Sequence, residues 1–511
     1  MVNKPEQTSG YLLGIDSGNT VIKAAVFDLQ GRELAVCNAK MQTAHPQCGF
    51  AETDMQAHWL HCVDAVRSAL AQSGVQASDV LAVGCSGHGN GLYLLDTQCE
   101  PLLAIQSMDA RAESLVTDGS LDVAAIQAIN GQGIWAAQTP MLLRWLKLNR
   151  PELYQRIGAA FLCKDYIGFR LTGECASDRT DMSGCGLIDF VRRDYSADLH
   201  ALYGIPEAGD YLPSLFESTD VIGGVTDDVA AQLGLSSGTP VVAGLFDVVA
   251  SALGSGVERT GQASIIAGTW SINQVVVEAL PEAGSIFMAS CFDRRRFLAI
   301  ESSATSATNL EWFVHEFCQP ERAGADQRGV SVFAVCNERL SSVEPSLDLP
   351  IFHPYLYGSG QSSLGRAGFF GVTGWHDRQT LLYAIYEGVV FGHRHHIERL
   401  RTAGIDFDSA ILTGGGARSD YWAQMFADVL NVEIHLSACS ETGARGAAIA
   451  AGVGAGTFPD YAAGVAAMTT ITRTFKPDQQ YQSIYERRYQ LFCRLLAAME
   501  PLWDSFSHDT P

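Results

Sequence analysis

The chain has 511 residues, of which 47% are hydrophobic and 18% are charged. This length exceeds one ordinary core and predicts two or three domains, and the composition is that of a folded globular protein. The 34 Lys and Arg residues against 56 Asp and Glu give a formal net charge of −22, which argues against nucleic acid or an acidic membrane as a main partner.

The 13 cysteines are scattered and form no C-x-x-C pair. Such a set favours reduced thiols in a cytoplasmic protein over a disulfide framework or a zinc site. The first ten residues, MVNKPEQTSG, are too polar for a signal peptide. The most apolar run, residues 241–253, contains Asp247 and is too short to span a bilayer.

The first elements in chain order alternate between strand and helix. Residues 11–28 predict a hairpin of two strands around a short polar turn, and residues 35–40 predict a further strand. Residues 53–73 predict a helix, with Thr53 and Gln56 resembling a capping box. Two apolar runs around a Gly-rich turn follow at 80–96. This order predicts an α/β domain.

The second half follows the same order, and the break between the halves falls at residues 245–260. A strand ending at Gly244 precedes a helix that begins near Asp247, and residues 263–278 again read as strand, turn and strand. Two amphipathic helices and a strand are expected after these, at 382–397, 419–430 and 432–436. We expect the two halves to pack around a cleft, where ligands are commonly bound.

The turn of the first hairpin carries polar groups that a plain turn does not need. Gly18 and Asn19 allow positive φ, so that their backbone N–H groups would form a small anion nest, and Thr20 adds a hydroxyl donor. Asp16 is a candidate ligand for Mg²⁺, and Lys23 is a candidate for added positive charge. An ordinary hairpin with convenient turn residues is the alternative.

Two further glycine-bearing turns are candidates for phosphate or nucleotide contacts. The turn at Gly268 and Thr269, followed by Trp270, would oppose the first turn and clamp a polyphosphate. The strand from 411 ends in Gly414, Gly415 and Gly416, which would let a flat ring or a phosphate approach the backbone. The alternative for each is a flexible connection, and the chain has no Walker-type GxxxxGK[ST] motif.

A lone acid, Asp247, interrupts an apolar run at the expected start of a helix. It is either the N-cap of that helix or a general base, because the helix N-terminus favours the ionised form, which can accept a hydroxyl proton.

Candidate sugar contacts lie at other expected strand ends, with ordinary loop chemistry as the alternative for each. They are the segment Ser86 to Gly91, which includes Gly89 and Asn90, the pair Asp109 and Arg111, and the segment Lys164 to Tyr166.

Two other patterns favour structural roles. His393 and His396 could share a metal, but no third ligand is near in the sequence, so we interpret them as ordinary helix residues. The small-residue run 442–456 predicts a tightly packed helix.

Taken together and in this order, the motifs resemble the FGGY family of carbohydrate kinases, within the actin–hexokinase–Hsp70 superfamily. The resemblance covers residues 11 to 490, and the stretch GGGARSDYWAQMFADVL, at 414–430, is its most specific part. The combination of FDVV, GTW, NLEWF, LYG and YEGVVF is most similar to that of L-xylulose kinases.

The resemblance implies two ribonuclease-H-like α/β domains around a cleft, at 11–250 with the sugar and phosphate site and at 251–490 with the nucleotide site. Asp247 matches the catalytic base, and it falls with Gly89 and Asn90 where related kinases hold the sugar. Asp16 and Asp247 are the implied Mg²⁺ ligands. The implied phosphate and Mg²⁺ region contains Asp16, Thr20, Gly268 and Thr269, and the implied adenosine site contains Gly414, Gly415, Gly416 and Ala417. The full set of predicted ATP contacts adds Gly18, Asn19, Lys23 and Ser419.

Three positions depart from the family pattern and put the identity of the sugar in doubt. Leu142 stands where the family usually has a lysine, Trp270 where many members have serine, and Asn90 where D-xylulose kinases usually have histidine.

The resulting hypothesis is an ATP- and Mg²⁺-dependent cytoplasmic kinase of a small sugar, most simply a ketopentose such as L-xylulose. A homodimer is possible, and neither nucleic acid nor a membrane is expected as a partner. The alternatives are D-xylulose, ribulose, a polyol or a sugar acid as substrate, or an ATP-binding module of the actin or Hsp70 type without metabolite kinase activity.

Overall fold

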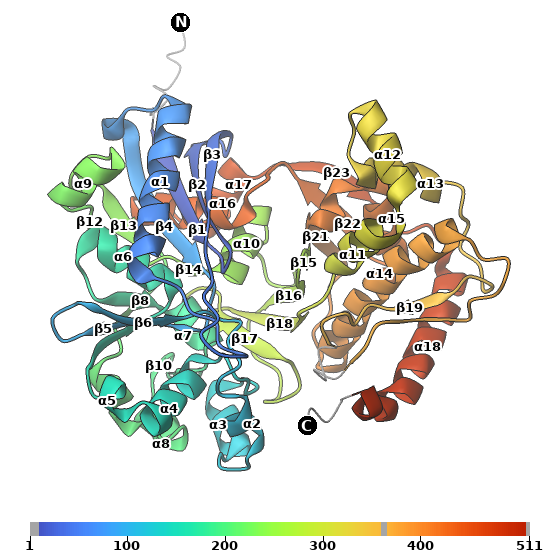
Figure 1. The fold of residues 1–511 in the computed structure, drawn as a ribbon. Coiled ribbons are helices and arrows are strands. Elements are labelled where there is room, and N and C mark those ends of the chain that lie inside the picture. Colours follow the sequence, from blue (N-terminus) through green and yellow to red (C-terminus); the bar gives the residue numbers. More distant parts are fainter. Residues whose placement is uncertain (1–9, 359–364, 507–511) are drawn as a thin grey trace, which may run out of the picture. The chain divides into compact units, whose positions relative to one another are not determined.

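The structure is a computed structural model that describes residues 10–358 and 365–506 (Figure 1). The chain forms two compact units built from interleaved segments. The first unit runs to residue 260 and adds 276–299 and 439–470, and the second comprises 261–275, 300–438 and the chain from 471 onward. The sequence-based division at residue 250 concerns the family domains and stays a prediction. Within the described residues, no helix is both long and apolar enough to cross a membrane.

A seven-stranded sheet forms the centre of the first unit. The predicted hairpin is confirmed, because β1 and β2 pair antiparallel, and β1 also pairs parallel with β4. β13 and the short β14 both pair parallel with β4. Because β14 pairs with the last residues of β4, the next helix, α10 (Asp247–Ser255), begins at the carboxyl end of β4. The strand order is β12 (Val221–Gly224), β13 (Pro240–Val242), β4 (Val80–Gly87), β1 (Tyr11–Ser17), β2 (Val21–Asp28), β3 (Glu33–Lys40), with β14 (Leu245–Phe246) beside β4.

Helix α1, Met55–Ser73, packs against β2 and β3 through the predicted apolar stripe, including the buried Trp59 and Val66. The predicted capping box is wrong. Asp54 is the N-cap, and its carboxylate accepts the Ala57 N–H at 2.7 Å, so the shorter Asx cap takes the place of the Thr53–Gln56 pair.

Helix α16, Thr442–Gly454, belongs to the first unit although it lies late in the chain. Figure 1 shows this orange helix beside the blue strands β1 and β4. Its small residues permit backbone contact, as predicted: a Cβ on Gly14 of β1 would collide with the Ala444 carbonyl, and one on Gly84 of β4 with the Ala447 carbonyl. The helix therefore packs closely against the middle of both central strands.

A smaller three-stranded sheet, β6-β5-β7, completes the first unit with surrounding helices. The remaining strands are β5 (Leu92–Asp96), β6 (Pro101–Ile105), β7 (Ile157–Phe161), β8 (Ala176–Asp178), β9 (Ile188–Asp189), β10 (Asp194–Tyr195), β11 (Ser214–Phe216) and β17 (Met288–Cys291). The remaining helices are α2 (Glu113–Thr117), α3 (Val123–Asn130), α4 (Thr139–Asn149), α5 (Pro151–Tyr154), α6 (Cys163–Thr172), α7 (Arg179–Gly184), α8 (Ala197–Leu202), α9 (Asp227–Leu233), α10 (Asp247–Ser255) and α17 (Tyr461–Met468).

The second unit repeats the central arrangement of the first. An antiparallel hairpin, β15–β16, pairs through β15 with the parallel strand β21, which is followed by β22 and β23. The strands are β15 (Ala263–Ala267), β16 (Ser271–Val277), β18 (Phe297–Ser303), β19 (Ile351–His353), β20 (Gly368–Phe370), β21 (Ser409–Gly414), β22 (Glu433–Ser437) and β23 (Ile471–Phe475).

The helices of the second unit include the long α14, which is joined to α18 by a buried ion pair. Arg488 donates to Glu387 through Nε at 2.6 Å and Nη2 at 2.5 Å. The helices are α11 (Thr308–Phe317), α12 (Gln319–Arg328), α13 (Val332–Leu340), α14 (Arg378–Thr402), α15 (Asp420–Leu430) and α18 (Gln482–Met499). The two sheets with their helices confirm the predicted α/β class.

Candidate active site

Asp16 lies at the carboxyl end of β1, directly opposite Ser86 of β4. The Ser86 hydroxyl donates to Asp16 Oδ1 at 2.8 Å. A Cβ on Gly443 of α16 would lie 2.5 Å from Asp16 Oδ2, so the glycine makes room for the carboxylate. Burial raises the pKa of Asp16, and the Ser86 hydrogen bond and Lys23 oppose that rise.

The turn after Asp16 differs from the predicted nest. Neither Gly18 nor Asn19 has positive φ, and the Gly18 N–H is already bound to the Val21 carbonyl at 3.0 Å. Asn19 is held from the side: its Nδ2 donates to Ser107 Oγ at 2.9 Å, and its carbonyl accepts from the Gln106 amide at 2.8 Å. The expected positive φ is therefore wrong, because the turn is shaped by the local Gly18–Val21 hydrogen bond and by the contacts of Asn19 with the distant residues 106 and 107.

The two remaining candidate residues of this hairpin differ in how available they are to a ligand. Thr20 is exposed, so its side chain is accessible to a ligand. The Lys23 ammonium pairs with Glu441 at 2.7 Å, so part of its charge is already neutralised.

Asp247 is the first residue of α10, and the N-cap is Phe246, which has no side-chain oxygen. The N-cap interpretation of Asp247 is therefore wrong. The backbone before it is tightly held: Gly244 has φ +84°, and the Phe246 N–H donates to the Thr180 hydroxyl at 2.9 Å. The aspartate thus stands on a fixed strand-to-helix corner.

The electrostatic surroundings of Asp247 favour its neutral form. Burial raises its pKa to about 8, with a further contribution from the negative charge of Asp16, and the Val248 N–H only partly opposes this. Two carboxylates that repel each other in this way are a suitable pair for a cation.

The predicted sugar segment forms a close corner next to Asp247. Asn90 has φ +61°, is 7% exposed, and its Oδ1 has no hydrogen-bond partner among the described residues. A Cβ on Gly89 would lie 2.5 Å from the Phe246 ring and 2.9 Å from Asp181 Oδ1. The structure therefore brings Gly89, with Asn90 next to it in the chain, against Phe246, the residue that precedes Asp247.

Two other candidate sugar contacts are engaged inside the protein. Asp109 accepts from the Ala51 N–H at 2.6 Å and from Arg111, and the guanidinium of Arg111 also reaches Glu52 at 2.8 Å. Lys164 has no exposed side-chain surface; it pairs with Asp165 and lies 2.9 Å from Asp178. These groups support the loops rather than present a free surface.

Two residues beside this site, Thr180 and Asp181, were not among the contacts predicted from the sequence. Both oxygens of the buried Asp181 lack a hydrogen-bond partner among the described residues, and the Lys164 ammonium is 3.7 Å away. The available signal was the spacing of Asp178, which ends the short strand β8, and Asp181 in the helix that follows. This spacing could not be interpreted from the sequence, because the contact of Lys164 with both carboxylates is visible only in the structure.

In the second unit the two predicted glycine turns lie side by side. β15 and β21 pair so that Ala267 is opposite Gly414. Gly414 has φ +80°, and a Cβ there would lie 2.7 Å from the Ala267 carbonyl oxygen and 3.1 Å from the Gly268 nitrogen. The Gly268 carbonyl accepts the Ala307 N–H at 2.9 Å, which ties the turn at Gly268 and Thr269 to the start of α11.

The other residues of the glycine motif have different constraints. A Cβ on Gly416 would lie 2.8 Å from Ala267 Cβ, whereas one on Gly415 would make only ordinary contacts, at 3.5 Å or more. Ala417 follows in the short 3₁₀ turn, and Ser419 caps α15, with Oγ accepting the Trp422 N–H at 3.1 Å. Ser419 therefore has a structural role in addition to any ligand contact.

His393 is a core residue that supports the Gly268 turn. Its ring nitrogens reach Ser271 Oγ at 3.1 Å and Asn273 Oδ1 at 2.8 Å on one side and Ser306 Oγ at 2.9 Å on the other. His396 instead faces Glu301 and Ser303. Hydrogen bonds to neighbouring side chains therefore engage both histidines, and the part of the chain that the structure describes contains no group of three side chains suited to a metal.

Comparison with known families matches residues 11–254 to the N-terminal domain and residues 263–455 to the C-terminal domain of the FGGY family of carbohydrate kinases. The chain belongs to the FGGY family of carbohydrate kinases. The predicted family and fold are thereby confirmed, and the chain is a sugar kinase of a family that uses ATP as phosphoryl donor.

The curated relatives extend over almost the whole chain. It is 35% identical over 495 residues to L-xylulose/3-keto-L-gulonate kinase of Escherichia coli, covering 96% of this chain and 97% of the relative. A probable L-xylulose kinase of Haemophilus influenzae is 32% identical, covering 96% and 99%. An autoinducer-2 kinase of Klebsiella pneumoniae is 28% identical, covering 97% and 95%.

Solved structures agree on the fold. A xylulose kinase from Rhodospirillum rubrum has a TM-score of 0.87 at 27% identity, covering 97% of this chain and all of that one. A gluconate kinase from Lactobacillus acidophilus has a TM-score of 0.88 at 21% identity, covering 98% and 100%, and shows the fold alone.

Proposed function

We propose that the protein transfers the γ-phosphoryl group of ATP to a small ketose, with L-xylulose as the first candidate. The names of the relatives that are 32–35% identical support this choice. Membership of a kinase family removes the alternative of an actin- or Hsp70-like module without metabolite kinase activity.

The observation that carries the proposed mechanism is the position of Asp247. Its carboxylate starts α10 beside Asp16 and next to the corner that contains Gly89 and Asn90. We assign Asp247 as the base that accepts the proton of the sugar hydroxyl, whose oxygen then attacks the γ-phosphorus while the bond to ADP breaks. Positioning of the hydroxyl contributes more than proton removal, because the transition state of phosphoryl transfer is loose.

The remaining candidate residues take binding roles in this proposal. Gly89 and Asn90 contact the sugar, and the unpartnered Asn90 Oδ1 is suited to a sugar hydroxyl. The two hairpin turns contact the phosphates, with Asp16, Gly18, Asn19, Thr20 and Lys23 in the first and Gly268 and Thr269 in the second. The adenosine is assigned to Gly414, Gly415, Gly416, Ala417 and Ser419.

Asp16 and Asp247 together fit a magnesium ion. Mg²⁺ commonly binds through one or two carboxylates and completes its shell with water and phosphate oxygens, so the lack of a third ligand among the described residues is no obstacle. When bound, the ion would neutralise phosphate charge.

A second substrate, a keto sugar acid, is favoured by a specific observation. The Escherichia coli relative is named for 3-keto-L-gulonate as well as for L-xylulose. The 28% identity to an autoinducer-2 kinase adds a third compound to be tested.

The test is sugar-dependent ADP release with Mg²⁺-ATP, measured in a coupled assay. The panel contains L-xylulose, D-xylulose, L- and D-ribulose, 3-keto-L-gulonate, xylitol, gluconate and autoinducer-2. We expect L-xylulose to give the highest kcat/KM. A higher value for another compound corrects the substrate, and ADP release that no compound in the panel stimulates contradicts the proposal.

A further inference from the structure

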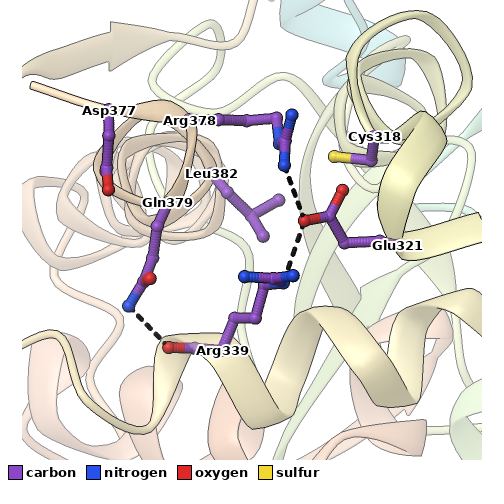
Figure 2. Close-up of a pocket in the computed structure, with 7 residues that line it drawn as sticks. All are labelled: Cys318, Glu321, Arg339, Asp377, Arg378, Gln379 and Leu382. Carbon is purple, nitrogen blue, oxygen red and sulfur yellow. Dashed lines mark hydrogen bonds and ion pairs between the residues drawn. The ribbon is translucent and has the colours of Figure 1, made fainter. Parts of the chain in front are cut away.

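A pocket of about 290 Å³ opens at the junction of helices α11, α12, α13 and α14 in the second unit. Figure 2 shows its side chains converging from these helices: Cys318, Glu321, Arg339, Asp377, Arg378, Gln379 and Leu382. None of them belongs to the proposed sugar, phosphate or nucleotide contacts. Cys318 follows the C-terminal end of α11, and the Gly268 turn adjoins its N-terminal end. The length of this helix, about 15 Å, therefore separates the two places.

Glu321 lies at the centre of the pocket and is only half satisfied. Glu321 is 2% exposed. Its Oε1 accepts from Arg339 Nε at 2.9 Å and from Arg378 Nη2 at 3.1 Å. Its other oxygen, Oε2, has no hydrogen-bond partner within the described chain, and Figure 2 shows it turned away from the two ion pairs. A buried carboxylate oxygen without a donor is costly, so this atom is suited to a hydroxyl or an N–H of a ligand.

The two arginines supply the opposite chemistry. Their side chains are 48% and 41% exposed, and each has one ion-pair contact, with Glu321. A guanidinium has five N–H donors, so both retain donors that suit carboxylate or phosphate oxygens. Arg378 and Gln379 also begin the 25-residue helix α14, whose N-terminus adds positive potential.

Asp377 also lines the pocket, and the positive N-terminus of α14 partly offsets its negative charge. Its Oδ1 accepts the Thr380 N–H at 2.9 Å as the N-cap of α14. A bare metal cation is disfavoured, because two guanidinium groups flank the free carboxylate oxygen.

We propose that this pocket binds a small anion that carries hydroxyl groups. The phosphate or carboxylate of the ligand would contact Arg339 and Arg378, and one hydroxyl would donate to Glu321 Oε2. The volume lies at the lower limit for ligand pockets, which suits a pentose phosphate or a sugar acid better than the larger nucleoside triphosphates.

Isothermal titration calorimetry on the full chain tests the proposal. The probes are ribose 5-phosphate, gluconate and inorganic phosphate, each added in the presence of a non-hydrolysable ATP analogue. We expect saturable binding of at least one hydroxylated anion, tighter than that of inorganic phosphate. The tighter of ribose 5-phosphate and gluconate identifies the preferred acidic group.

Three variants assign the binding to the pocket. Arg339→Gln and Arg378→Gln each leave the other ion pair in place. Each should weaken binding of the hydroxylated anion about tenfold, which is the effect of one lost charge-assisted hydrogen bond. Glu321→Gln should remove the preference for the hydroxylated anion over inorganic phosphate. The matched control is Arg328→Gln, because Arg328 pairs with Glu338 on the exposed surface of the same helices and should change nothing.

Two outcomes overturn the inference. One is the absence of saturable binding of either hydroxylated anion, and the other is binding that neither arginine variant weakens. If an arginine variant fails to fold, Glu321→Gln still decides, because an unchanged preference over phosphate contradicts the role of Oε2. The readout needs no turnover, so it stands or fails independently of the proposed kinase substrate.

Discussion

Asp247 illustrates how opposing effects on one carboxyl group are weighed. The N-terminus of a helix and the Val248 N–H both favour the ionised form, whereas burial and the charge of Asp16 favour the neutral one. The second pair dominates, because the pKa rises to about 8. A carboxyl group with this pKa is a stronger base than an ordinary aspartate, but it is mostly protonated at neutral pH, so proton acceptance by Asp247 should increase as the pH rises toward about 8.

Replacing Asp247 with asparagine should abolish most phosphoryl transfer while the protein still binds ATP, because Asp16 and the glycine turns assigned to the nucleotide remain. The amide keeps the size of the side chain but cannot accept the proton, a loss worth about 10²-fold or more in kcat. Steady-state kinetics and calorimetric ATP titration measure the two effects. The control is Asp228→Asn, since Asp228 is an exposed acid in the first turn of α9. Near-normal turnover of Asp247→Asn would remove this residue from the mechanism.

His353 should make the stability of the chain sensitive to acid. The side chain is 0% exposed, and burial lowers its pKa to about 4, whereas the unfolded value is about 6.5. Between these values only the unfolded state binds the proton, so stability present above about pH 6.5 is lost as the pH falls. The loss by about pH 5 amounts to about 2 kcal/mol.

A comparison of two proteins isolates this contribution, because other buried groups also titrate. Calorimetric Tm values are measured for the wild type and for His353→Gln at about pH 7.5 and about pH 5. The decrease in Tm should be smaller in the variant. Equal decreases would mean that His353 takes up its proton without unfolding.

At the scale of elements, the contact between α10 and α16 determines where Asp16 and Asp247 stand. A Cβ on Gly446 of α16 would collide with the Ala250 carbonyl of α10, and one on Gly254 of α10 would collide with the Thr442 carbonyl of α16. The two helices therefore touch backbone to backbone. Asp247 begins one of them, and Asp16 lies against Gly443 of the other.

Gly446→Ala should destabilise the first unit by about 1–3 kcal/mol, because the added methyl group forces the helices apart. The matched control is Gly168→Ala in α6, where a Cβ meets only Ile222 Cδ1 at 3.4 Å. That change should be neutral or stabilising, since alanine favours a helix by up to about 1 kcal/mol. Thermal unfolding of both variants provides the comparison, and equal Tm values would contradict the close-contact argument.

The glycine turn after β21 gives a second prediction at this scale. The neighbouring backbone requires Gly414 and Gly416, but only ordinary contacts surround Gly415. Gly415→Val should therefore fold normally and weaken ATP binding about tenfold or more, because its side chain would occupy the space assigned to adenosine. Sugar affinity should stay the same. Unchanged ATP affinity measured by calorimetry would contradict the assignment.

At the scale of the whole molecule, periodicity and turn residues were sufficient to predict both hairpins and the helices α1, α14, α15 and α16. These elements depend on local patterns of apolar and small residues. The φ angles at Gly18 and Asn19 could not be predicted, because Gln106 and Ser107 hold that turn from a distant segment. For the same reason the sequence did not reveal that His393 supports the Gly268 turn or that Thr180 holds the backbone before Asp247.

The net charge of −22 makes a prediction for the entire chain. Repulsion between excess carboxylates acts over the Debye length, about 30 Å at 0.01 M salt and about 8 Å at 0.15 M. Ion pairs such as Lys23–Glu441, at 2.7 Å, are screened less at these concentrations. Added KCl should therefore raise the Tm at neutral pH, because it weakens the long-range repulsion more than it weakens the pairs.

The pH dependence of this salt effect separates repulsion from other actions of salt. The isoelectric point of the sequence is about 4.9, so the net repulsion vanishes near pH 5, where KCl should leave the Tm unchanged or lower it. Calorimetric scans at the two salt concentrations, at neutral pH and near pH 5, give the four values required. A Tm that falls with salt at neutral pH would mean that ion pairs outweigh the excess of 22 negative charges.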